Sequence, residues 1–70
     1  MKKYILEEKE NNKKTGFKTV NEIAQYLKVD YFRCRELYYE SYKPKKFLHP
    51  VLKNLKEKYN IYMNPEYGYG

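Results

Sequence analysis

A chain of 70 residues is the size of one small domain, which excludes most enzyme architectures. Fifteen Lys and Arg against nine Asp and Glu give a formal net charge of +6, a balance that favours acidic partners such as nucleic acid. One cysteine and one histidine can complete neither an intramolecular disulfide nor a structural zinc site. We therefore expect a non-enzymatic protein without a metal or a cofactor.

The low content of aliphatic residues and Phe predicts a small hydrophobic core. Ile, Leu, Val and Phe supply only 15 of the 70 residues, while ten Tyr raise the aromatic share to 19%. A chain of this length buries only about 60% of its unfolded surface, so marginal stability or self-association is expected. Three tyrosines fall on expected core faces: Tyr26, Tyr38 and Tyr59. Five others are harder to bury: Tyr31, Tyr39, Tyr62, Tyr67 and Tyr69.

Composition also bears on location and source. No apolar run approaches the roughly 20 residues of a membrane span, so we expect no membrane association. The lone cysteine is typical of a reducing compartment, which predicts a cytoplasmic protein. Residues with A/T-rich codons (Lys, Asn, Tyr, Ile) number 32, against nine with G/C-rich codons (Gly, Ala, Arg, Pro). This bias predicts a low-GC bacterium, or its phage or plasmid, and the host cell cytoplasm for a phage-encoded protein.

Residues 1–14 are expected to form an N-terminal patch followed by a polar connector. Residues 3–7 make a short apolar patch whose length fits either a strand or one helical turn. Residues 8–14 contain no apolar side chain, and Thr15-Gly16, which follows, marks the end of this connector. Ile61-Tyr62-Met63 is also short and apolar, so it can pair with Tyr4-Ile5-Leu6 as a two-strand clasp.

A first helix is predicted directly after Thr19. Thr19 and Glu22 have the spacing of a capping box, in which the Thr hydroxyl accepts from the amide three residues on. The apolar residues that follow recur at helical spacing on one face: Val20, Ile23, Ala24 and Leu27. The pattern breaks after Leu27, which predicts a turn there.

A second helix is predicted over residues 31–42. Asp30 is its expected N-cap, and Pro44 ends it because the residue before a proline resists the helical conformation. Its core face is expected to carry Cys34, Leu37, Tyr38 and, at the margin, Tyr42. The remaining residues point to the other faces.

A third helix is predicted to begin at Pro50, with His49 as its N-cap and Asn60 as its stop. Its expected buried stripe consists of Val51, Leu52, Leu55 and Tyr59. Residues 43–58 carry six lysines against one glutamate, so this basic loop and helix hold +5 of the net charge.

Residues 20–39 resemble the helix-turn-helix of phage repressors, excisionases and related bacterial regulators. The resemblance rests on the spacing of Ile23-Ala24, Leu27, Val29, Cys34 and Leu37. In that family a small residue such as Ala24 lets the second helix cross close to the first. The family usually has glycine in the turn, where a left-handed conformation is needed. Lys28 stands at this position, so either the turn is modified or a strain of about 1 kcal/mol is tolerated.

The fold class expected from these elements is all-α, a compact three-helix helix-turn-helix domain, with the short terminal two-strand clasp as an optional addition. The domain spans residues 15–63 and includes the basic third helix. Residues 64–70 are expected to form a flexible tail.

The resemblance implies a small sequence-specific regulator or recombination accessory protein that binds double-stranded DNA as a homodimer, with helix 31–42 in the major groove. Its base contacts would be Tyr31, Phe32, Arg35, Glu36 and Tyr39. Arg35 suits guanine, Glu36 suits cytosine, and Phe32 suits a thymine methyl. Its phosphate contacts would be Thr19, Arg33, Lys43, Lys45, Lys46, Lys53 and Lys56.

The second helix also fits another class of function. Residues 31–40 carry two arginines and two glutamates, and aromatic anchors with little net charge suit a protein interface. The alternative is therefore an inhibitor or adaptor from a mobile element that blocks a host or phage protein complex. Cys34 is expected to be a small core residue rather than a nucleophile, and His49 a cap or a surface residue.

Overall fold

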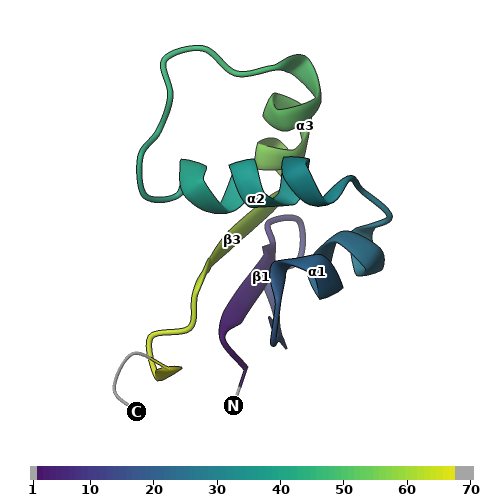
Figure 1. Cartoon of the computed structure of the whole chain (residues 1–70), viewed down its shortest axis with the longest axis vertical. Helices are drawn as coiled ribbons and strands as arrows, with labels where there is room; N and C mark the ends of the chain where they lie inside the picture. The colour runs from purple at the N-terminus through teal and green to yellow at the C-terminus, as the bar shows by residue number, and fades with distance from the viewer. Residues whose placement is uncertain (1, 68–70) are drawn as a thin grey trace.

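The computed structural model describes residues 2–67, which form three helices and a three-stranded antiparallel sheet (Figure 1). In chain order the elements are β1 (Tyr4–Glu8), β2 (Lys13–Phe17), α1 (Val20–Leu27), α2 (Tyr31–Glu40), α3 (Pro50–Lys58) and β3 (Tyr59–Met63). No helix in this part of the chain has the length and apolar character needed to cross a membrane.

The expected all-α fold is wrong, because strands flank the helices on both sides in the sequence. The strand order is β2-β1-β3, with β1 in the centre. The clasp predicted between Tyr4-Ile5-Leu6 and Ile61-Tyr62-Met63 is present, and Leu6 lies opposite Ile61. It is part of a larger sheet, because β2 pairs antiparallel with the other edge of β1.

Residues 9–12 are the turn of a β-hairpin between β1 and β2, not part of a polar connector. Asn12 adopts a left-handed conformation (φ 58°), which asparagine tolerates, and the Lys13 amide donates to Asn11 Oδ1 (2.9 Å). The hydrophobic pattern fails to reveal β2 because Phe17 is the one apolar side chain among its five residues. Backbone pairing with β1 defines this strand instead.

One core joins the sheet to the helices. Leu6 and Ile61 come from the sheet and are fully buried, together with Ile23, Leu37 and Leu52, one from each helix. In Figure 1, α2 runs across the middle of the molecule, and it contacts α1, α3 and β3. The position of α2 is therefore fixed from several sides.

The predicted helix starts are confirmed. Each N-cap side chain accepts a hydrogen bond from a backbone amide: Thr19 Oγ1 from Glu22 (3.2 Å), Asp30 Oδ1 from Phe32 (2.8 Å) and His49 Nδ1 from Val51 (3.2 Å). These bonds satisfy amides that have no partner within their helix.

The second helix ends earlier than predicted, at Glu40 rather than at Tyr42. Ser41 and Tyr42 turn toward β3 instead. The Ser41 hydroxyl donates to the carbonyl of Ile61 (2.5 Å), and the Met63 amide donates to the Tyr42 hydroxyl oxygen (2.9 Å). These bonds engage backbone groups along β3, which protects that edge of the sheet from pairing with another chain.

The third helix also ends early, at Lys58, because Tyr59 is extended (φ −137°, ψ 154°) and opens β3. Asn60 therefore lies inside a strand and is not a helix stop. Of the three tyrosines expected in the core, Tyr38 and Tyr59 are half-buried. The Tyr38 ring meets the Tyr4 ring edge to face at a centroid distance of 5.2 Å.

Three residues expected in the core are largely exposed: Tyr26 (48%), Tyr42 (53%) and Val51 (46%). In α3 it is the neighbouring Leu52 that enters the core, with 1% of its surface exposed. The Tyr26 ring lies against Phe17 of β2 (centroid distance 5.4 Å), a partner that an all-α fold does not provide.

Residues 64–67, the first part of the predicted tail, form a turn beside the N-terminal segment. The Asn64 amide donates to the Lys3 carbonyl (2.8 Å), and Asn64 Nδ2 donates to the Lys2 carbonyl (2.9 Å). The rest of that tail, residues 68–70 with Tyr69, lies outside the described residues.

The turn between α1 and α2 depends on Lys28, which adopts the left-handed conformation (φ 58°, ψ 44°). Of the two possibilities that the sequence left open, the strained turn is therefore the one present. The amide of Lys28 donates to the carbonyl of Gln25 (3.3 Å), and the amide of Val29 donates to the carbonyl of Ala24 (3.0 Å). These two bonds end α1 and redirect the chain into α2 within three residues.

We predict that Lys28→Gly raises the free energy of unfolding by about 0.5–1 kcal/mol. Glycine removes the left-handed penalty of about 1–2 kcal/mol but adds entropy to the unfolded chain. Urea unfolding measures the change. Lys28→Ala is the matched control and should show no gain, because its Cβ keeps the penalty. A glycine variant no more stable than the alanine variant would show that this turn carries no strain.

Candidate nucleic-acid interface

Helix α2 presents one face to the core and the opposite face to solvent. Cys34 and Leu37 are buried, with 0% and 1% of their surfaces exposed. At 3.6 residues per turn, the side away from them carries Tyr31, Phe32, Arg35 and Tyr39, all of which are exposed. We call these four residues the α2 surface. They are four of the five residues predicted to contact bases.

The fifth predicted base contact, Glu36, lies beside the α2 surface and not on it. It is half-buried, and its Oε1 is 3.4 Å from Arg33 Nη1, one helical turn away. Arg33, a predicted phosphate contact, is half-buried as well. The ion pair occupies both charges, so the α2 surface keeps one charged side chain, Arg35.

Arg35 and Tyr39 form a preorganised pair in the centre of the α2 surface. Arg35 Nε and Nη2 both donate to the Tyr39 hydroxyl oxygen, at 3.3 and 3.2 Å. The guanidinium carbon also lies 5.4 Å from the centroid of the Tyr39 ring. The hydrogen bond with Tyr39 is the main reason that the pKa of Arg35 is raised above its ordinary value. Arg35 is thus charged, oriented and open to a partner.

Most of the lysines predicted to contact phosphate are exposed. Lys43, Lys45 and Lys46 lie in the loop that arcs from α2 to α3 (Figure 1), and Lys53 lies on α3. Lys56 differs, because its Nζ is 3.0 Å from Oε1 of Glu40. Lys56 therefore holds a structural ion pair.

Glu40, which the sequence pattern does not single out, anchors the basic loop. Its carboxylate is buried, with 3% of the residue exposed, and it accepts from Lys56 Nζ (3.0 Å) and from the backbone amide of Lys45 (3.1 and 3.2 Å). Burial raises the pKa of Glu40, but the hydrogen bonds from Lys56 and Lys45 outweigh it, so the net pKa lies below its ordinary value. The buried charge thereby ties α2, the loop and α3 together.

A small cleft of about 250 Å³ lies at the start of α1, next to the α2 surface. Its lining residues are Lys3, Tyr4, Lys18, Thr19, Val20, Asn21 and Tyr31. Thr19 was predicted here as a phosphate contact through the amides of the helix start. Lys3 and Lys18 were not predicted. Lys18 could have been predicted from the sequence, because it directly precedes the N-cap Thr19. Lys3 could not, because only the pairing of β1 in the sheet brings it to the cleft.

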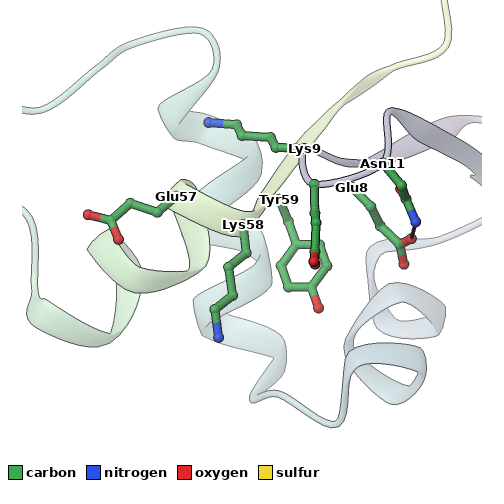
Figure 2. Close-up of a pocket in the computed structure, with 7 residues that line it drawn as sticks. Glu8, Lys9, Asn11, Glu57, Lys58 and Tyr59 are labelled. Carbon is green, nitrogen blue, oxygen red and sulfur yellow. Dashed lines mark hydrogen bonds between the residues drawn. The ribbon is translucent and has the colours of Figure 1, made fainter.

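A second cleft, of about 520 Å³, lies on a different part of the molecule, between the β1–β2 turn and the end of α3 (Figure 2). In Figure 2, Glu8 and Asn11 come from the hairpin side and Glu57 and Lys58 from the α3 side, with Tyr59 between them. Asn11 Nδ2 donates a hydrogen bond to Glu8 Oε2 (3.4 Å). Charges of both signs line this cleft, and the described residues contain no cluster suited to a metal ion.

The one cysteine and the one histidine of the chain have structural roles. Cys34 is fully buried, and burial, with a smaller effect from Asp30, raises the pKa of its thiol to about 11. A thiol of this kind stays protonated and is a poor nucleophile. His49 caps α3 through Nδ1. Both observations agree with the roles expected for Cys34 and His49 as a core residue and a cap.

Comparisons of the chain with protein-family models, with curated proteins and with solved structures find no match.

We predict that Glu40→Gln flattens the acid side of the stability profile. Because the pKa of Glu40 is lower in the folded than in the unfolded chain, its stabilising effect is present above the unfolded value and is lost as the pH falls through the folded value. Wild type should therefore lose stability below about pH 4.5, and the variant should lose less. Urea unfolding between pH 3 and pH 7 measures this.

The exposed Glu10 provides the control for that experiment. Glu10→Gln removes the same charge and should leave the acid profile of the wild type in place. Equal profiles for wild type and Glu40→Gln would contradict the anchoring role of Glu40.

Proposed function

We propose that this protein is a small sequence-specific regulator or recombination accessory protein of phage or plasmid type that binds double-stranded DNA with α2 in the major groove. The observation that carries the proposal is the exposure of the α2 surface after a left-handed turn at Lys28. Burial of Cys34 and Leu37 on the opposite side is the arrangement that a recognition helix needs. The family resemblance of residues 20–39 supports the same reading.

The chemistry of the α2 surface suits the reading of bases. Arg35 offers N–H groups to the N7 and O6 acceptors of guanine, and Tyr39 already orients its guanidinium. The Phe32 side chain is 66% exposed and wholly apolar. Contact with an apolar group of a base would remove this surface from water, which is favourable. Glu36 is left out of this account because it is half-buried and its carboxylate lies 3.4 Å from Arg33.

The basic segments suit the phosphates on either side of the groove. Lys43, Lys45 and Lys46 would meet one strand from the loop after α2, with Lys53 of α3 nearby in the sequence. Thr19 and its neighbours in the α1 cleft would meet the other strand. Lys56 contributes only indirectly, by holding Glu40.

We propose that the protein acts as a homodimer, because one copy of a domain this small covers little DNA. Single DNA-binding modules bury about 600–1,000 Å², which gives limited affinity. Two copies on half-sites about 34 Å apart would double the contacts and would require a palindromic site.

A protein-binding inhibitor or adaptor from a mobile element is the second candidate. The observation that favours it is the aromatic character of the α2 surface, where Tyr31, Phe32 and Tyr39 are 39%, 66% and 48% exposed. Exposed aromatic anchors on a helix without net charge also suit a host or phage protein as partner.

We predict that Arg35→Ala removes the preference for guanine within the site and weakens binding to the preferred site about 5- to 150-fold, since a bidentate pair with guanine contributes about 1–3 kcal/mol. Fluorescence anisotropy with a site selected from a random duplex pool measures this. For the wild type, the logarithm of affinity should fall linearly and steeply with the logarithm of salt concentration.

Lys14→Ala is the control matched in charge. Lys14 is exposed on β2 and lies outside the proposed interface, so its loss should leave the sequence preference intact. Duplex binding that is weak, nonspecific and equal in all three proteins would contradict the proposal. A stoichiometric host protein captured after nuclease treatment would then favour the inhibitor.

A further inference from the structure

We propose that each half-site of the preferred DNA contains a thymine whose C5 methyl is contacted by Phe32 and Tyr31, within two base pairs of a guanine read by Arg35. This inference rests on the proposed function and names the class of site that the α2 surface selects. It follows from which polar groups on α2 remain free and which apolar groups are exposed.

Few polar side chains on α2 are free to form hydrogen bonds with base edges. Adenine is read most strongly by the paired donor and acceptor of Asn or Gln, and the sequence of α2, YFRCRELYYE, contains neither. Cytosine requires an acceptor such as a carboxylate, but Glu36 is paired with Arg33 at 3.4 Å and Glu40 is buried. Arg35 is therefore the one side chain of α2 that is suited to bidentate reading of a base.

The remaining area of the α2 surface is aromatic. Phe32 is 66% exposed and contacts Tyr31 edge to face, with a centroid distance of 5.6 Å, so the two rings form one apolar wall. In the major groove, the only apolar group on a base edge is the C5 methyl of thymine. Apolar rings of this kind gain more free energy at thymine than at the other three bases, by about 0.8 kcal/mol for the buried methyl group.

Helix geometry sets the distance between the base contacted by Phe32 and the base contacted by Arg35. Phe32 and Arg35 are three residues apart, which corresponds to a rise of about 4.5 Å along α2. Successive base pairs are about 3.4 Å apart. The methyl contacted by Phe32 and the guanine contacted by Arg35 should therefore belong to adjacent or next-but-one base pairs.

Replacement of thymine by uracil tests the inference, because dU lacks the C5 methyl but keeps the pairing and the O4 acceptor of dT. We measure anisotropy with the duplex selected from a random pool, in dT form and in forms with dU at single positions. The expected result is a loss of affinity of about three- to fivefold at each contacted position. Those positions should lie one or two base pairs from a guanine whose replacement removes the dependence on Arg35.

Two variants connect the effect to α2. Phe32→Ala should bind the dT and dU duplexes nearly equally, and it should fold normally because Phe32 is on the surface. Phe47→Ala removes an even more exposed phenyl ring (82%) outside α2 and should keep the wild-type ratio between dT and dU. Far-UV circular dichroism verifies the fold of both variants.

The failure of this inference differs from the failure of the proposed function. Equal affinity of the wild type for dT and dU duplexes, with the Arg35 and salt dependence intact, would overturn thymine reading and leave DNA binding in place. A dT preference that persists in Phe32→Ala would overturn the assignment to the α2 surface. Absence of selective duplex binding would overturn both.

Discussion

The left-handed turn at Lys28 is the constraint on which the proposed interface depends. It ends α1 through bonds to Ala24 and Gln25 and lets α2 start three residues later in a new direction. Ala24 is 5% exposed in the same cluster as Cys34, so the two helices pack closely. With that packing fixed, the α2 surface must face solvent. A continuous helix through this region would place the same residues differently.

The sheet makes this arrangement stable in a chain with few aliphatic residues. Leu6 and Ile61 fill the core beneath the helices, and Ser41 and Tyr42 connect the end of α2 to β3. The buried Glu40 then holds the basic loop and α3 to the same end of α2. The α2 surface is therefore supported at both ends, which is what specific recognition of a rigid partner requires.

The sequence predicted one long-range feature, the pairing of residues 4–6 with residues 61–63. The other parts of the fold that it predicted have local causes. The caps, the turn at Lys28 and the buried face of α2 follow from spacings of three and four residues. β2 could not be predicted in this way, because Lys13–Phe17 is a strand only through its pairing with β1. Glu40 likewise gains its role from Lys56, 16 residues away. The α2 surface was predictable apart from Glu36, whose side chain is half-buried and paired with Arg33.

Mapping of amide chemical shifts tests the central claim most directly. The ¹⁵N-labelled protein is titrated with a duplex selected from a random pool, and the shift of each amide is followed to saturation. The account predicts that the largest changes lie in residues 31–39, with smaller changes at residues 18–21 and 43–46. Unchanged α2 amides, or changes centred on the cleft between the β1–β2 turn and α3, would contradict it.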